Sequence, residues 1–252
     1  MEADMKVAGL DLGSVNTKLV ILDNDQPVYK KTLPSRFDPV TTGRELLKEA
    51  YKEYRPEKTV VTGYGRVSFP ESRVITEITC QARGCHHFYP EVSYILDLGG
   101  QDAKVIKKNA QGKVINFVMN DKCAAGTGRF LDVIFKGLHL APGDIGLALE
   151  AEPVAINSMC TVFAESEVIG LLAKGTSKLS VLAGLFKSTA TRLAHFIETA
   201  GQPESLVFTG GGAYYQPLVQ LLAKQLSIQV MTPPEPELTA AFGAALIGVS
   251  EG

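Results

Sequence analysis

The chain has 252 residues, of which 45% are hydrophobic and 21% are charged, and this composition is typical of a globular protein with one or two lobes. Its formal net charge of -2 gives no indication of a nucleic-acid partner. The N-terminus has no apolar signal segment, and the uncharged run 206–223 contains glycines and a proline, so we expect a cytoplasmic protein without a membrane partner. In that compartment, four cysteines indicate reduced thiols, metal binding or redox chemistry rather than disulfides.

The first elements in chain order are two short apolar strands, 6–12 and 17–22, joined by a glycine-containing turn. A helix is expected over 42–54, where apolar side chains recur at helical spacing, and then a strand over 58–65 that ends in glycines. The pattern starts again after this strand. Strands are expected at 94–98, 103–107, 113–119 and 205–209, and helices at 127–138, 161–174, 178–200, 214–226 and 237–249.

The tripeptide Asp-Leu-Gly occurs at 11–13 and again at 97–99, each time between two predicted strands. A repeat of strand, aspartate, glycine turn and strand favours two related α/β lobes, with no low-complexity linker between them. We therefore expect an N-terminal lobe at 1–94 and a C-terminal lobe at 95–237, with the C-terminal helix 238–252 packed back on the N-terminal lobe.

Three glycine turns at strand ends favour a nucleotide site. The turn 11–18, DLGSVNTK, supplies backbone N–H groups, hydroxyl groups, a lysine and a carboxylate, which phosphates and their metal ion need. The turn 97–104, DLGGQDAK, repeats this arrangement, and the glycines of 209–212, TGGG, suit a flat adenosine. Neither a P-loop lysine motif nor the GxGxxG pattern occurs in the chain. A ligand-free hairpin turn is the alternative for 11–18, because glycine and asparagine between strands are typical of turns.

Six segments spread over nearly the whole chain carry a resemblance to a known family. They are GLDLGSVNTK (9–18), TGYGR (62–66), DLGGQDAKVI (97–106), MNDKCAAGTGRFLD (119–132), CTVFAESEVI (160–169) and VFTGGGA (207–213). These segments resemble the BadF/BadG/BcrA/BcrD ATPase family, within the superfamily of acetate and sugar kinases, heat-shock protein 70 and actin. Inside the family, the sequence is most similar to the activator component of 2-hydroxyacyl-CoA dehydratases. The resemblance implies an α/β fold of two ribonuclease H-like lobes with a nucleotide cleft between them.

The resemblance implies how ATP or ADP is held. Asp11 would face a Mg²⁺ ion, Asp97 would lie near the same ion, and Gln101 would orient the attacking water. The residues implied to line the phosphates or border the adenosine are Gly13, Ser14, Thr17, Lys18, Gly99, Gly100, Gly210, Gly211 and Gly212.

The resemblance also implies that Cys123 and Cys160 bind iron in a [4Fe-4S] cluster. Each of these cysteines precedes a predicted helix, and a helix N-terminus stabilises thiolates and an anionic cluster. Such a cluster commonly takes four thiolates, and one chain offers only this matched pair. A symmetric homodimer would therefore hold one cluster between its subunits.

Cys80 and Cys85 have no role in that scheme. Together with His86 and His87 they form an alternative zinc site, although structural zinc ligands usually come as two separated pairs. For Cys123 taken alone, the alternative is a buried structural cysteine that packs as a small hydrophobic side chain.

The resemblance implies an ATP-dependent activator, that is, an ATPase coupled to low-potential electron transfer. Its cluster would pass an electron to a 2-hydroxyacyl-CoA dehydratase or a similar CoA-linked reductase, and a ferredoxin or flavodoxin would supply that electron. The sequence names neither the acceptor enzyme nor its acyl-CoA substrate. One alternative is a small-molecule kinase of the same superfamily with structural cysteines, in which Asp102 could act as the base. A nucleotide-dependent scaffold is the other alternative.

Overall fold

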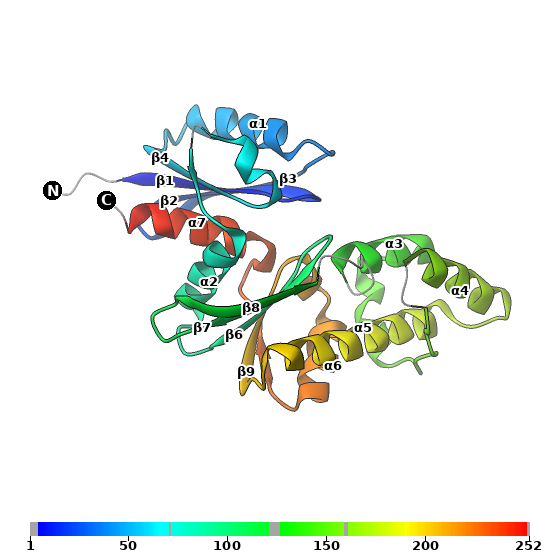
Figure 1. Ribbon diagram of the computed structural model, residues 1–252. Coiled ribbons are helices and arrows are strands. Elements are labelled where there is room, and N and C mark those ends of the chain that lie inside the picture. Colours follow the sequence, from blue (N-terminus) through cyan, green and yellow to red (C-terminus); the bar gives the residue numbers. More distant parts are fainter. Residues whose placement is uncertain (1–4, 71, 121–126, 159–160, 251–252) are drawn as a thin grey trace. The chain divides into compact units, whose positions relative to one another are not determined.

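Figure 1 shows the fold as a computed structural model. The residues that the structure describes are 5–70, 72–120, 127–158 and 161–250. The described residues form two five-stranded sheets, and the chain divides into two compact units. The segments of unit 1 are Met1–Ser93, Ile106–Asn116 and Pro233–Gly252. Those of unit 2 are Tyr94–Val105 and Phe117–Thr232.

The first sheet consists of β1 (Lys6–Leu12), β2 (Asn16–Asp23), β3 (Gln26–Pro34), β4 (Lys58–Thr62) and β5 (Arg73–Val74). Their order across the sheet is β3-β2-β1-β4-β5, so β1 lies at the centre. β1 pairs antiparallel with β2 and parallel with β4. This register places Asp11 opposite both Lys18 and Thr62.

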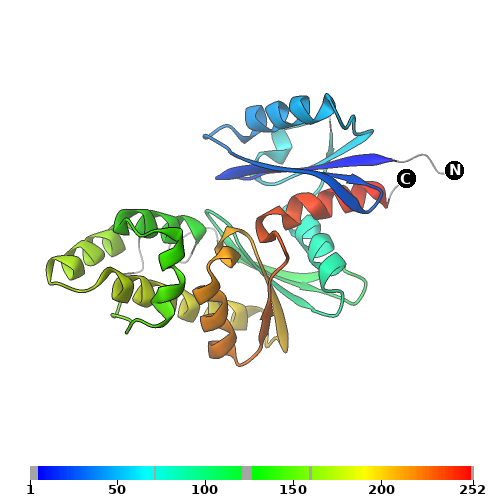
Figure 2. The ribbon, with the colours of Figure 1, turned by 180° about the vertical axis from the view of Figure 1, so that it is seen from behind.

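Both faces of this sheet are apolar, because successive side chains of a strand point to opposite faces. Leu19 of β2 packs in the cluster of α1 (Pro39–Tyr51), whereas its neighbour Val20 packs in the cluster of α7 (Thr239–Val249). The two helices therefore cover opposite faces of the sheet, as Figures 1 and 2 show. Burial on both sides explains why β1 and β2 are almost continuous apolar runs in the sequence.

The small side chains of α7 let this helix pack closely on α2 (Glu77–Phe88) as well as on the sheet. A Cβ atom at Gly243 would lie 1.8 Å from the backbone oxygen of Cys80, so only glycine fits at this helix contact. Helix α7, red in Figure 1, follows unit 2 in the chain and packs on β1, β2 and β4 of unit 1.

The second sheet consists of β6 (Tyr94–Leu98), β7 (Ala103–Lys108), β8 (Val114–Asn120), β9 (Ser205–Thr209) and β10 (Gln229–Met231). Their order is β10-β9-β6-β7-β8, and the parallel pairing of β6 with β9 places Asp97 opposite Thr209. The apolar core of unit 2 includes Phe130, Phe186 and Phe208. The helices of this unit are α3 (Gly128–Leu138), α4 (Thr161–Ala173), α5 (Lys178–Ala200) and α6 (Gln216–Leu226).

Some observed elements differ from the sequence-based prediction. The strand expected at 58–65 ends at Thr62, because Gly63 turns the chain with a φ of 88°. No element was expected at β3, an edge strand whose side chains are mostly exposed and show no apolar alternation. The prediction also lacks α2, because this helix buries cysteine, alanine and glycine rather than large apolar residues.

Short 3₁₀ segments connect the larger elements: η1 (Tyr64–Ser68), η2 (Pro142–Asp144), η3 (Gly146–Leu149), η4 (Gly211–Tyr214) and η5 (Pro236–Leu238). The helix expected from residue 214 therefore begins at Gln216, after η4. Among the helices in the described ranges, none has the length and hydropathy needed to span a bilayer.

Candidate functional site

The carboxylate of Asp11 lies at the end of β1, beside the turn that leads into β2. Asp11 is 2% exposed, and its Oδ2 accepts a hydrogen bond from Lys18 Nζ at 2.8 Å. Its Oδ1 is buried and has no hydrogen-bond partner among the described residues. A buried polar atom without a partner is costly. This oxygen therefore fits Mg²⁺ or one of its bound waters, because Mg²⁺ prefers oxygen ligands.

The first glycine turn is held by Ser35, the residue after β3. Ser35 Oγ donates a hydrogen bond to the backbone oxygen of Gly13 at 2.6 Å. The hydroxyl groups of Ser35 and Thr17 lie 2.9 Å apart and share a second hydrogen bond. Thr17 is fully buried, whereas Gly13 and Ser14 are partly exposed. The Thr17 hydroxyl group thus supports the turn from inside, and the backbone at Gly13 and Ser14 remains accessible.

Unit 2 repeats this arrangement at the end of β6. Lys104 Nζ lies 3.5 Å from Asp97 Oδ2 and 2.6 Å from Asp102 Oδ1. Asp97 and Lys104 are each 3% exposed, so the buried lysine charge is paired with the buried Asp97 as well as with the more exposed Asp102. Thr209 Oγ1 donates to Asp97 Oδ1 at 3.3 Å. Gln101, the residue expected to orient water, is exposed in the turn.

A glycine lies beside each aspartate. It follows a buried threonine, which is the last residue of the neighbouring parallel strand. These glycines are Gly63 after β4 and Gly210 after β9, and their φ values are 88° and 80°. Such values favour glycine. A Cβ atom would lie 2.4 Å from Asp11 Oδ1 at Gly63 and 2.8 Å from Asp97 Oδ1 at Gly210. The two units thus hold one carboxylate each by the same means.

The glycines expected to border the adenosine have different surroundings. A Cβ atom at Gly212 would lie 2.2 Å from Leu98 Cδ2, so packing against β6 explains this glycine. Gly211 is exposed, and among the described residues nothing lies within 4 Å of the place that its Cβ atom would take. The space over Gly211 is therefore open to a flat ligand.

Helix α3 begins directly at the second glycine turn. Its first backbone N–H groups, those of Gly128 and Arg129, donate to the carbonyl oxygens of Gly99 (2.8 Å) and Gly100 (3.1 Å). The first four N–H groups of a helix have no partner inside that helix, and the Thr127 side chain provides no cap. The turn expected to bind phosphate therefore supplies the cap of α3.

Cys123 and Cys160, the expected iron ligands, lie outside the described residues. In the sequence, Cys123 stands between β8 and α3, and Cys160 directly precedes α4. Their role in binding a cluster stays a prediction.

The chain before α4 is tied to that helix by Glu167. This carboxylate accepts hydrogen bonds from the backbone N–H groups of Asn157 at 3.0 Å and Ser158 at 2.8 Å. Hydrogen bonds from Ser158 and then Asn157 hold the pKa of Glu167 below its usual value. Glu167 thus fixes the segment that leads to Cys160 in the sequence.

Comparison with known proteins decides the family. The model of the BadF/BadG/BcrA/BcrD ATPase family matches residues 8–248. The chain belongs to the BadF/BadG/BcrA/BcrD ATPase family. It is 38% identical to the (R)-2-hydroxyglutaryl-CoA dehydratase activating ATPase of Acidaminococcus fermentans, over 94% of this chain and 95% of that protein. The solved structure of the activator of the 2-hydroxyisocaproyl-CoA dehydratase from Clostridium difficile, with bound ADPNP, matches with a TM-score of 0.90 at 38% identity. That match covers 98% of this chain and 95% of the activator.

The fold of this BadF/BadG/BcrA/BcrD ATPase recurs in sugar kinases. A ROK family glucokinase from Streptomyces griseus, in complex with glucose and AMPPNP, matches with a TM-score of 0.64 over 98% of this chain and 100% of that chain. The identity is 11%, so this likeness shows the fold alone. Together with the match to the activator structure, it confirms the predicted α/β fold. The much higher identity to dehydratase activators does not favour the kinase alternative.

Several residues that hold the two turns of this family member are missing from the sequence-based site. β4 and β9 both end in a threonine that is followed by a glycine, and the spacing from aspartate to lysine is the same in both turns. These signals could have revealed three of the residues. Ser35 gives no such signal, because it reaches its turn from another strand. The missing residues are Ser35, Gly63, Lys104 and Thr209.

Cys80 and Cys85 are both buried in α2. Burial raises the pKa of the Cys80 thiol to about 12, so it stays protonated near neutral pH, whereas metal binding needs the thiolate. His87, part of the alternative zinc site, packs edge to face against Phe242. The part of the chain that the structure describes contains no group of three or more histidine, cysteine, aspartate or glutamate side chains that could hold a metal ion. We therefore interpret Cys80 as a packing residue.

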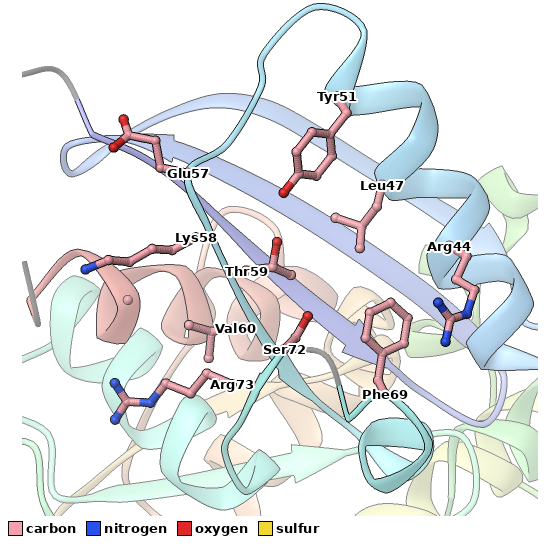
Figure 3. A pocket seen from close by; sticks show the side chains of 11 residues that line it. Arg44, Leu47, Tyr51, Glu57, Lys58, Thr59, Val60, Phe69, Ser72 and Arg73 are labelled. Atoms are coloured by element: carbon pink, nitrogen blue, oxygen red, sulfur yellow. The ribbon is translucent and has the colours of Figure 1, made fainter.

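A cavity of about 740 Å³ lies elsewhere in unit 1, beside α1, β4 and β5 (Figure 3). Arg44 and Tyr51 of α1 and Arg73 of β5 line it, and the guanidinium group of Arg44 lies 4.7 Å from the ring centroid of Phe69. Its lining, within the described ranges, includes none of the residues expected to bind nucleotide.

Proposed function

We propose that this family member is an ATPase that passes an electron to a 2-hydroxyacyl-CoA dehydratase, or to a similar CoA-linked reductase, and so activates it. The ATPase part rests on one observation, the buried aspartate that is paired with a lysine in each unit, with a positive-φ glycine beside it. The activator part is supported by similarity to dehydratase activators over nearly the whole chain.

Asp11 and Asp97 are the carboxylates that we assign to Mg²⁺, directly or through its bound water. The unpartnered Oδ1 atom of Asp11 supports this role. Lys18 now bonds the other oxygen of Asp11 at 2.8 Å. When a cation binds Asp11 in place of Lys18, the lysine can form a charge-assisted hydrogen bond to a phosphate oxygen. Backbone N–H groups of the glycine turns bind the remaining phosphate oxygens, and the exposed Gln101 orients the attacking water.

We assign Cys123 and Cys160 of two identical subunits to one [4Fe-4S] cluster. The donor set fits, because such a cluster takes four thiolates and each subunit offers two. When bound, the cluster supplies a one-electron carrier. Exposed apolar side chains on β8 and α4 flank both cysteines in the sequence. These side chains are Phe117, Met119, Phe163 and Ile169.

The partners in this proposal are an acyl-CoA dehydratase or reductase as electron acceptor and a low-potential ferredoxin or flavodoxin as donor. The dehydratases named in the relatives support the acceptor class. We place the reaction in the cytoplasm, where thiols stay reduced. A kinase would need a base, and its candidate Asp102 is held by Lys104 at 2.6 Å.

The ATPase part is tested by Mg²⁺-dependent ATP hydrolysis in Asp11→Ala, with Asp25→Ala as the matched control. Asp25 is an exposed acid in the turn between β2 and β3. We expect Asp11→Ala to lower kcat by about 100-fold, the usual effect of removing one group that stabilises developing charge. Asp25→Ala should keep the parent rate. Parent-like hydrolysis by Asp11→Ala would show that this carboxylate does not serve the nucleotide.

The cluster part is tested separately by anaerobic purification and metal analysis. We expect a brown protein with about four irons per dimer. A colourless protein, or a complete cluster in each monomer, would refute the shared cluster and leave the ATPase part standing.

A further inference from the structure

Helix α3 is bonded to unit 2 at a second point, in addition to the carbonyl groups of Gly99 and Gly100. The hydroxyl group of Tyr215 donates a hydrogen bond to Asp132 Oδ1 at 2.8 Å. Asp132 lies in the second turn of α3, and Tyr215 comes shortly after the glycines 210–212. Both glycine turns of unit 2 that we assign to the nucleotide therefore hold the same helix.

The ring of Tyr215 is fixed as well as its hydroxyl group. Its centroid lies 6.4 Å from that of Phe135 of α3 and 5.6 Å from that of Phe186 of α5. The backbone N–H group of Tyr215 donates to the carbonyl oxygen of Gly212 at 3.2 Å. One residue thus joins the glycine turn to α3 by a main-chain hydrogen bond, a ring contact and a side-chain hydrogen bond.

The donor and acceptor of the side-chain hydrogen bond are settled by their surroundings. Burial raises the pKa of Tyr215 well above its usual range, and the neighbouring charge of Asp132 raises it further. The phenol group therefore keeps its proton and donates, and the carboxylate accepts. A hydrogen bond to a charged acceptor is stronger than one between neutral groups.

We propose that Tyr215 is a positioning residue that transmits nucleotide binding from the glycine turn 210–212 to α3 through its hydrogen bond to Asp132. A nucleotide that orders this turn also orders Tyr215, which then holds α3. The inference rests on the proposed function, because it takes 210–212 as part of the nucleotide site. It adds a specific contact by which the bound nucleotide acts on the helix that follows Cys123 in the chain.

Hydrogen exchange of the α3 amides measures this transmission on the full chain, purified anaerobically. In the parent protein, saturating ADP with Mg²⁺ should slow exchange in α3 by about tenfold. Tyr215→Phe removes the hydroxyl group and keeps the ring. In this variant, ADP should slow the exchange of the α3 amides by only about twofold or less. Tyr214→Phe is the matched control, because it removes a hydroxyl group from the neighbouring tyrosine, which is 51% exposed. This control should retain the parent value.

A double-mutant cycle with Asp132→Asn separates transmission from packing. Asp132→Asn preserves the size of the side chain but removes its charge, so it should also weaken the effect of ADP. The double variant should lose no more of that effect than Tyr215→Phe alone. A merely structural role predicts another result, in which α3 exchanges faster in both states and the ratio with and without ADP stays at the parent value.

Calorimetric titration with ADP in the same variants distinguishes this inference from the proposed function. If the parent protein does not bind ADP, the proposed function fails and the inference fails with it. If the parent binds ADP and Tyr215→Phe keeps the parent exchange ratio, transmission through Tyr215 is refuted while the nucleotide site stands.

Discussion

Replacing Gly63 with alanine tests whether the position of the Asp11 carboxylate controls turnover. Gly63 has a φ of 88° and a ψ of -176°, a conformation that is nearly confined to glycine and costs other residues roughly 1–3 kcal/mol. The new Cβ atom would lie 2.4 Å from Asp11 Oδ1 and 2.7 Å from backbone atoms of Leu12. Overpacking of this kind costs about 1–3 kcal/mol. The two costs add to about 2–6 kcal/mol. Folded domains are stable by about 5–15 kcal/mol, so the variant should still fold.

Gly175→Ala is the steric control, because Gly175 has a φ of 85° and nothing among the described residues lies within 4 Å of its Cβ position. In urea denaturation, this control should lose only the backbone cost of about 1–2 kcal/mol. In ATP hydrolysis, Gly63→Ala should lose about 100-fold in kcat, because a displacement near 1 Å of a catalytic group has effects of that size. Gly175→Ala should keep the parent rate. Equal stabilities and equal rates for the two variants would refute the idea that Gly63 keeps Asp11 in place.

Cys123→Ser and Cys160→Ser should each lose the iron of the anaerobically purified protein, whereas Cys80→Ser should keep it; the opposite pattern in metal analysis would favour a zinc site. Near neutral pH, Cys80 should resist alkylation until the protein unfolds, because its pKa is raised to about 12, and mass spectrometry of the labelled native protein checks this. Glu167→Gln should cost about 1 kcal/mol near neutral pH, because Glu167 accepts hydrogen bonds as a partly exposed carboxylate. The stabilisation that the Glu167 carboxylate provides is complete above its ordinary pKa of 4.5, and it is lost as the pH falls through the lower folded-state pKa. Urea denaturation at low pH should therefore show no difference in stability between Glu167→Gln and the parent. The exposed Glu165, changed to glutamine, should have no effect at either pH.

The core of each aspartate turn could be predicted because its residues are close in the sequence. Asp11 and Lys18 face each other across the β1–β2 hairpin, so a short motif contains both partners. Ser35 and Gly63 reach the same turn from β3 and β4. Only the order and register of the strands bring them there, and a local pattern does not encode that register.

A motif also does not determine where a side chain points. Thr17 is among the residues expected to line the phosphates, and the structure directs its hydroxyl group to Ser35. The elements missing from the prediction, β3 and α2, lack a pattern of large apolar residues in the sequence. β1 and β6 are buried runs that their apolar residues reveal, whereas β3 is an exposed edge strand and α2 packs through small side chains.

The order of synthesis matters for unit 1, because α7 is made after the whole of unit 2. Val20 and Leu22 of β2 pack in the cluster that α7 completes, and α7 also packs on β1, the strand that ends at Asp11. While the ribosome is still adding residues before Pro233, this face of the sheet has no cover, and uncovered apolar surface in a nascent chain promotes aggregation. The segments of unit 2 are complete by Thr232, so this unit can fold first. A nascent chain without α7 therefore contains Asp11 but lacks the helix that supports its strand, and ATP hydrolysis should begin only after α7 has left the ribosome.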